Sequence, residues 1–229
     1  MSHQTVFPGR PGAPPVSAAV LVAHGGRSAS TATVTPYQPA VLRMIPVAAA
    51  IRRALPGDDA VVTRPLYRLR GWNGDLASPV ADLTGALDQL SEQFGPIPVV
   101  LVGHSMGARA AMRVAGHPRV IAVAGLAPWL PPGEPVQQLT GRRVLLAQAP
   151  GDRITKPADT WAYAERARQL TTVATIEVQH GDHAMLRRAP LWHRIAIGFV
   201  RVALGLPDGD PTVSQAFQAA ETGGPRLVV

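Results

Sequence analysis

Apolar residues follow two alternating patterns along this chain. Short continuous apolar runs are typical of strands buried on both faces of a sheet, and they occupy residues 17–23, 60–66, 98–102, 120–126, 143–148 and 173–178. Segments with apolar residues three or four positions apart predict amphipathic helices at residues 39–55, 79–94, 106–115, 157–170 and 190–204. This alternation predicts an α/β fold with a mostly parallel sheet that helices cover on both faces.

The pattern continues over residues 16–205, which we interpret as a single domain of a 229-residue chain. Residues 1–15 are rich in proline and glycine and predict a flexible arm. Residues 206–229 are more polar and contain glycine and proline, which predicts a loosely ordered tail. Pro46 lies inside the predicted helix 39–55 and should kink it or mark its true start.

The composition favours a globular protein. Hydrophobic residues make up 46% of the chain and charged residues 16%, and no run reaches the roughly 20 apolar residues that span a bilayer. The N-terminus lacks the basic-then-apolar order of a secretory signal, so we expect a cytoplasmic protein. The absence of cysteine excludes disulfides and thiolate metal sites.

The net charge of +7 would suit an anionic partner, but the basic residues are scattered and nearly all arginine. A nucleic-acid site would be expected to show a basic tract interleaved with aromatic residues, and the sequence has none. We therefore expect no nucleic-acid partner.

One segment carries a recognisable chemical pattern. Gly103-His104-Ser105-Met106-Gly107 follows a predicted strand and opens a predicted helix, which is the context of a nucleophile elbow. In that turn the two glycines make room for a strained serine whose hydroxyl stands above the sheet. The pattern predicts Ser105 as a nucleophile; the alternative is a flexible Gly-Ser turn without chemistry.

A serine hydroxyl needs a base, and the base needs a carboxylate that orients it. His183 follows the last predicted strand and is the candidate base; it could instead be a capping or loop histidine, and His180 is less well placed. Asp152 follows the strand at 143–148 and is the candidate carboxylate, unless it only pairs with Arg153. The other candidates are Asp182, which is adjacent to the histidine, and Asp159, in the first turn of a helix.

Acyl chemistry also requires backbone N–H groups that receive the charge developing on the substrate oxygen. The loop His24-Gly25-Gly26-Arg27 follows the first strand, and the expected donors are the N–H groups of Gly26 and Met106. A Gly-Gly turn is common for other reasons, so this assignment depends on the elbow.

Two arginines and a tryptophan follow the predicted strand 60–66, at the edge of the sheet where ligands bind. Arg68, Arg70 and Trp72 could bind the carboxylate or phosphate of an acidic substrate. Alternatively, the arginines pair with Asp75 or Asp82 and the tryptophan packs the loop.

These motifs, in their order along the chain, resemble the α/β-hydrolase superfamily: His-Gly-Gly, Gly-His-Ser-Met-Gly, Gly-Asp-Arg-Ile and Gly-Asp-His-Ala. The chain is also similar to compact actinobacterial hydrolases described as predicted esterases or dienelactone-hydrolase-like proteins, which share the run from Tyr67 to Gly74. The resemblance implies the α/β-hydrolase fold. Only a helix, two strands and a Pro-rich link separate Ser105 from Asp152, so no large cap domain is expected. Arg27 stands where lipase-like members have a further glycine.

We therefore expect a serine hydrolase that cleaves a carboxylic ester, lactone or related acyl bond through an acyl-Ser105 intermediate, without a metal or organic cofactor. Its partner would be a small-molecule acyl substrate, and an anionic one if Arg68 and Arg70 bind it. An acyltransferase or a cofactor-free perhydrolase would use the same residues. A ligand-binding homologue that has lost turnover is the alternative outside enzymes.

Overall fold

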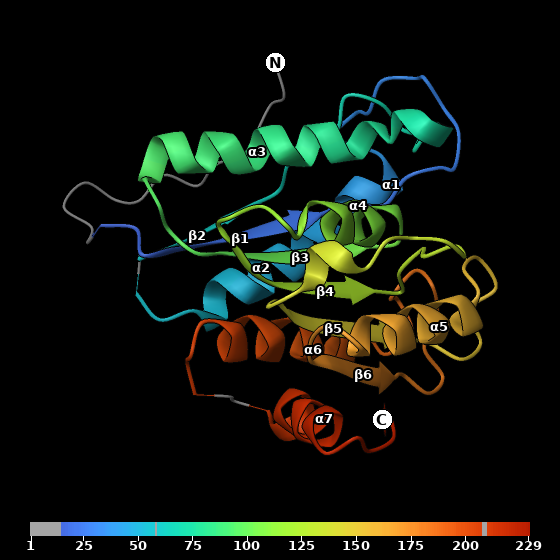
Figure 1. The fold of residues 1–229 in the computed structure, drawn as a ribbon. Helices are drawn as coiled ribbons and strands as arrows, with labels where there is room; N and C mark the ends of the chain where they lie inside the picture. Colours follow the sequence, from blue (N-terminus) through green and yellow to red (C-terminus); the bar gives the residue numbers. More distant parts are fainter. Residues whose placement is uncertain (1–14, 58, 208–209) are drawn as a thin grey trace.

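A seven-stranded sheet forms the centre of the protein (Figure 1). The computed structural model describes residues 15–57, 59–207 and 210–229. Neighbouring strands follow the order β2-β1-β3-β4-β5-β6-β7, and every pair is parallel. The strands are β1 (Ala18–Ala23), β2 (Ala60–Thr63), β3 (Val99–His104), β4 (Val120–Leu126), β5 (Arg143–Gln148), β6 (Val173–Glu177) and β7 (Leu227–Val228). The mostly parallel sheet expected from the sequence is confirmed.

Helices cover both faces of this sheet. One face packs against α3 (Ser78–Phe94), α4 (Met106–Val114) and α5 (Pro157–Arg168), and the other against α2 (Met44–Ala54), α6 (Ala189–Ala203) and α7 (Pro211–Glu221). Successive residues of β1 belong to opposite cores: Leu21 packs with the first set of helices and Val22 with the second. The continuous apolar runs match strands β1 to β6, which are buried on both sides at nearly every position.

Two element boundaries differ in detail from the expectation. The strand expected at 60–66 ends at Thr63, ahead of Pro65, which has no N–H to contribute to a sheet. The helix expected at 39–55 divides at Arg43 into α1 (Pro39–Leu42) and α2, with Pro46 in the first turn of α2. A proline is tolerated there because N–H groups of the first turn have no partner within the helix.

Residues 210–229, for which the sequence indicates a loosely ordered tail, contain helix α7 and strand β7. Helix α7 buries Val213, Ala216 and Phe217 against the core, and Phe217 stacks with Phe199 of α6 at a ring distance of 6.3 Å. The short strand β7 then pairs with β6. The three apolar residues are spaced as on one face of an amphipathic helix. The glycines and prolines on either side hid this pattern in the sequence.

Two short 3-10 helices, at Gly74–Leu76 and Gln137–Leu139, lie in the connections, and the described residues contain no large cap domain. The expected N-terminal arm lies outside the described residues except for residue 15. None of the helices in the described part of the chain has the length and apolarity that crossing a bilayer requires.

Candidate active site

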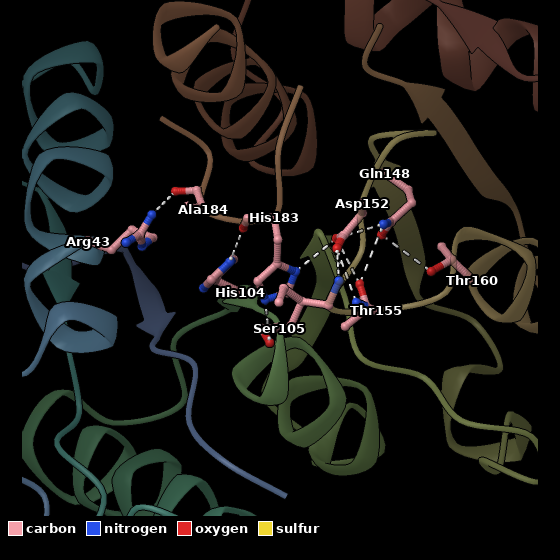
Figure 2. Close-up of polar contacts among 10 residues, drawn as sticks. Arg43, His104, Ser105, Gln148, Asp152, Thr155, Thr160, His183 and Ala184 are labelled. Atoms are coloured by element: carbon pink, nitrogen blue, oxygen red, sulfur yellow. Dashed lines mark hydrogen bonds and ion pairs between the residues drawn. The ribbon is translucent and has the colours of Figure 1, made fainter. Parts of the chain in front are cut away.

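The three side chains singled out as a catalytic set come from the carboxyl ends of three strands. Ser105 follows β3, Asp152 lies in the loop after β5, and His183 lies in the loop after β6. Parallel strands end at the same edge of a sheet, so residues distant in sequence meet there. Figure 2 shows the imidazole of His183 between the serine hydroxyl and the aspartate carboxylate.

Ser105 sits on a sharp, strained turn between β3 and α4. Its φ of 54° and ψ of −120° lie outside the regions that non-glycine residues prefer. A Cβ on Gly103 would come within 2.5 Å of the Ala108 backbone, and one on Gly107 within 2.4 Å of the His24 carbonyl oxygen. Both glycines therefore permit the close backbone contacts that keep the serine in this conformation.

The three side chains form a continuous hydrogen-bonded chain. His183 Nε2 lies 3.1 Å from Ser105 Oγ, and His183 Nδ1 lies 2.8 Å from Asp152 Oδ2. The carboxylate is completely buried, whereas 16% of the histidine side chain is exposed. This geometry fits a neutral histidine that donates from Nδ1 to the carboxylate and accepts the hydroxyl hydrogen at Nε2.

Asp152 is held as a carboxylate by several donors. Oδ1 accepts hydrogen bonds from the backbone N–H groups of Ile154 (2.8 Å) and Thr155 (3.1 Å), and Oδ2 accepts from the Thr155 hydroxyl (2.8 Å). Burial alone would raise the pKa of Asp152, but the hydrogen bonds from His183, Thr155 and Ile154 outweigh it and hold this pKa well below its usual range. Asp152 is thus ionised beside the imidazole.

Sequence reasoning missed the residues that support this carboxylate. Gln148 Nε2 donates to Asp152 Oδ2 at 3.0 Å, and the side-chain oxygen Oε1 of Gln148 accepts from Thr160 Oγ1 at 3.4 Å (Figure 2). Gln148 is fully buried at the end of β5. A buried glutamine ending an otherwise apolar strand was the available signal, because buried polar groups are nearly always hydrogen-bonded.

The glycine loop after β1 lies against the elbow. The backbone N–H groups of Gly26 and Met106 make no hydrogen bond to any described residue, whereas the N–H of Arg27 donates to the Arg70 carbonyl. A Cβ on Gly26 would come within 2.2 Å of the methyl carbon of Met106 and 2.5 Å of the Arg70 carbonyl oxygen. Both N–H groups thus lack a protein partner among the described residues, and position 26 requires glycine because the Met106 side chain and the Arg70 carbonyl fill the space of a Cβ.

The structure gives the arginine loop mainly structural contacts. Arg68 Nε donates to Asp82 at 2.5 Å, and Arg70 Nε donates to the Thr33 carbonyl at 3.0 Å. Trp72 is 3% exposed and lies under the guanidinium of Arg109, 3.8 Å from its ring centroid. Arg68 therefore makes one of the ion pairs raised as the alternative, whereas Arg70 contacts neither Asp75 nor Asp82. Within the described residues, no side-chain hydrogen bond or ion pair links these three residues to the triad.

An ion-pair cluster unforeseen from the sequence braces the elbow helix. Glu134, with 4% of its side chain exposed, accepts from Arg109 Nε at 2.5 Å and from Arg113 Nε at 2.6 Å. Both arginines belong to α4, and Trp129, on the connection that carries Glu134, donates its backbone N–H to the Ser105 carbonyl at 3.2 Å. The cluster therefore ties α4, the helix that follows Ser105, to the connection between β4 and β5.

Comparison with known proteins agrees with this architecture. The model of the alpha/beta hydrolase family matches residues 12–229. A search of curated proteins found no match.

The described residues contain no cluster of three or more histidine, aspartate or glutamate side chains that could hold a metal ion.

Several solved structures share the fold. A lidless α/β serine hydrolase from Xanthomonas campestris is 19% identical, with a TM-score of 0.58 and 90% of each chain covered. Est1E from Butyrivibrio proteoclasticus is 10% identical, with a TM-score of 0.63 and 88% of this chain and 94% of that chain covered. A monoacylglycerol lipase from Paleococcus ferrophilus is 13% identical, with a TM-score of 0.63 and coverages of 89% and 99%. At these identities the likeness concerns the fold.

Proposed function

The chain belongs to the alpha/beta hydrolase family, and from that premise we propose that it is a serine hydrolase that cleaves carboxylic esters, lactones or related acyl bonds. The observation that carries the proposal is the chain of hydrogen bonds from Ser105 through His183 to Asp152, on an elbow whose serine is held in a strained conformation. The esterase and lipase names among the structural neighbours are consistent with it.

The first half of the reaction acylates the serine. His183 Nε2 accepts the hydroxyl proton while Ser105 Oγ attacks the carbonyl carbon of the substrate. The tetrahedral intermediate then collapses, the bond to the leaving alcohol breaks, and His183 returns its proton to that alcohol. The product is an acyl-Ser105 ester and a free alcohol.

The second half regenerates the enzyme. Water loses a proton to His183 Nε2 and attacks the acyl carbon; collapse of the second intermediate returns the proton to Ser105 Oγ and releases the acid. Asp152 remains a carboxylate throughout, holds the histidine in the Nδ1–H tautomer and stabilises the imidazolium that forms twice per cycle. Its buried donors prevent it from taking the proton itself.

The charge on the substrate oxygen is received by backbone N–H groups. We assign this role to Gly26 and Met106, because Met106 directly follows Ser105, Gly26 lies against the Met106 side chain, and neither N–H group has a partner among the described residues. Removing one such donor from a hydrolase costs about 100- to 1,000-fold in kcat.

The surroundings of His183 favour a compact substrate. A cleft of about 660 Å³ borders this residue and is lined by the loops after β5 and β6, including Gly151, Ile154 and His180, whereas Ser105 does not line it. With no large cap in the described residues, little apolar surface is available to cover a long acyl chain. We therefore propose small acyl esters or lactones as the substrate class.

A fluorophosphonate probe tests the nucleophile directly, because it reacts with a serine only when a neighbouring base activates it. Wild-type protein should be labelled and Ser105→Ala should not. Ser91→Ala is a matched control, since Ser91 Oγ donates to the Leu87 carbonyl on the surface of α3, and it should be labelled like the wild type. Folded wild-type protein that resists the probe would contradict the proposal.

The substrate class is tested with p-nitrophenyl esters of increasing chain length. We expect kcat/KM to be highest for acetate and butyrate and to fall for chains of about ten carbons or more, because a long chain stays in water and contributes little binding free energy. A steep rise toward long chains, measured below the concentration at which the esters form micelles, would overturn the choice of compact substrates while leaving the nucleophile assignment intact.

A further inference from the structure

Two side chains from outside the His183 loop contact the backbone at and beside His183. His104 Nε2 lies 2.8 Å from the carbonyl oxygen of His183, and the guanidinium of Arg43 donates to the carbonyl oxygen of Ala184 (Figure 2). His104 is the last residue of β3, and Arg43 lies at the junction of α1 and α2. Elements distant in sequence thus meet at two consecutive carbonyl groups.

The loop that carries His183 lacks regular structure of its own. It connects β6 to α6, and His180, Met185 and Arg188 have φ angles of 58°, 55° and 59°. Non-glycine residues in this left-handed region are strained and persist only where their surroundings hold them. The position of the catalytic imidazole therefore depends on contacts from the rest of the protein.

His104 is a fixed neutral donor. It is 4% exposed, and burial, reinforced by the charges that His183 and Arg43 can carry, lowers the pKa of His104 to about 3. A neutral imidazole carries one N–H, and because Nε2 faces a carbonyl oxygen, the hydrogen belongs on Nε2. His104 Nδ1 has no partner among the described residues and lies beside Gly25. This ring, 5.0 Å from the ring of His183, does not compete for the Ser105 proton.

We propose that His104 and Arg43 are positioning residues, which fix the carbonyl groups of His183 and Ala184 and so keep His183 Nε2 within hydrogen-bonding reach of Ser105 Oγ. The inference rests on the proposed function, because the contact that it protects is the proton-transfer contact. A misplacement of about 1 Å in a catalytic group can cost on the order of 100-fold in rate. Contacts on two successive carbonyls restrain both the position and the tilt of the loop.

Arg43 offers the cleaner test because it is only partly buried. We expect Arg43→Met to lower kcat for p-nitrophenyl acetate about tenfold and to change KM less than about twofold, because the substrate still binds but the base is misaligned. Arg43→Lys keeps a cationic donor and should recover most of the lost kcat. Arg52→Met is the matched control. Arg52 lies within α2 and donates to the Gly57 carbonyl at 3.0 Å, away from the site, so kcat of this variant should equal that of the wild type.

His104 is tested by a pair of variants of similar size. His104→Leu removes the donor, whereas His104→Gln places an amide N–H near the same carbonyl, so kcat should fall in the first and largely recover in the second. Melting temperatures establish that each variant is folded. If His104→Leu does not fold, the Arg43 pair decides the question.

The rate of labelling by the fluorophosphonate probe separates this inference from the proposed function. If wild-type protein is not labelled, the proposed function fails and this inference with it. If the wild type is labelled and Ser105→Ala is not, the function stands, and slower labelling of folded Arg43→Met supports the inference. Labelling and kcat equal to the wild type in Arg43→Met, or equal losses in Arg43→Met and Arg43→Lys, would overturn the inference alone.

Discussion

Thr155 donates its hydroxyl hydrogen to Asp152 Oδ2 at 2.8 Å, the same oxygen that faces His183 Nδ1. The Thr155 N–H also donates to the other carboxylate oxygen, so one residue contacts both sides of the carboxylate. Together with Gln148 and Ile154, this buried threonine orients the Asp152 carboxylate relative to the imidazole.

The first prediction concerns that hydroxyl. Thr155→Val keeps the shape and the backbone hydrogen bond but removes one donor, so the carboxylate can rotate away from His183. We expect kcat to fall about tenfold with little change in KM, the signature of an interaction made in the transition state. Thr160→Val, which removes the more distant hydrogen bond to Gln148, should cost less than about threefold. Equal effects of the two variants in ester hydrolysis assays would show that the threonine serves only packing.

The second prediction identifies the acid. Asp152→Asn should keep the fold but lower kcat on the order of 10⁴-fold, because an amide favours the wrong tautomer of His183. Asp182→Asn should be far milder, since the Asp182 carboxylate accepts the backbone N–H of Arg187 at 2.8 Å and holds only the loop. Steady-state kinetics that rank these two variants in the opposite order would reject the assignment.

A third prediction concerns the elbow glycines. Gly107→Ala places a methyl group 2.4 Å from the His24 carbonyl oxygen, so backbone must move, and we expect a loss of about 1–3 kcal/mol in the free energy of unfolding and a large loss of activity. Gly85→Ala, in the middle of α3, meets no atom within 4 Å and should raise stability by about 0.5–1 kcal/mol. Urea denaturation measures both, and a well-tolerated Gly107→Ala would contradict the tight packing of the elbow.

The fourth prediction compares a buried and an exposed ion pair. Glu134→Ala leaves Arg109, with 12% of its side chain exposed, without its carboxylate partner, and we expect the free energy of unfolding to fall by about 3–5 kcal/mol. Glu165→Ala breaks a pair whose glutamate side chain is 68% exposed, and it should cost less than about 1 kcal/mol. If chemical denaturation gives similar losses of unfolding free energy for the two variants, the Glu134 cluster does little to hold α4 against the connection between β4 and β5.

The sequence was sufficient to predict features that depend on local pattern. The parallel sheet followed from apolar runs, and Ser105, Asp152 and His183 were singled out because each follows such a run. Contacts made across long stretches of chain were not predictable: Arg43 and Ala184 are 141 positions apart, and no local pattern marks a carbonyl oxygen as a partner.

The arginine loop shows a second feature that the sequence did not predict, namely the direction in which a side chain points. Arg68 sits where a substrate-binding arginine would sit, yet its Nε donates to Asp82, 14 positions along the chain, on α3. Whether an arginine faces ligand or protein depends on side-chain direction, which residue spacing in a loop does not determine. The short helix α7 was missed because Gly and Pro on both sides masked three apolar residues.

The last prediction concerns pH and two histidines that are buried and neutral. Burial lowers the pKa of His24 to about 4 and that of His104 to about 3. His24 is 3% exposed; its Nδ1 lies 2.7 Å from the Gly25 carbonyl oxygen and its Nε2 accepts from the Tyr67 N–H, so both ring nitrogens are engaged by the neutral form.

The direction of the pH effect on stability follows from how many protons the folded and the unfolded chain bind. Below the unfolded pKa of about 6.5 the unfolded chain takes up protons that the folded histidines exclude, so stability is full above this pH and declines as pH falls toward the folded pKa. Between pH 7.5 and pH 5.0 each histidine should cost about 2 kcal/mol of unfolding free energy. His24→Gln, whose amide can donate and accept, should lose less stability over this interval than the wild type by about that amount. His180→Gln, which removes an exposed ring, is the control and should follow the wild type. Urea unfolding at the two pH values measures these losses of unfolding free energy. If His24→Gln loses as much as the wild type, the fold does not exclude His24 from protonation.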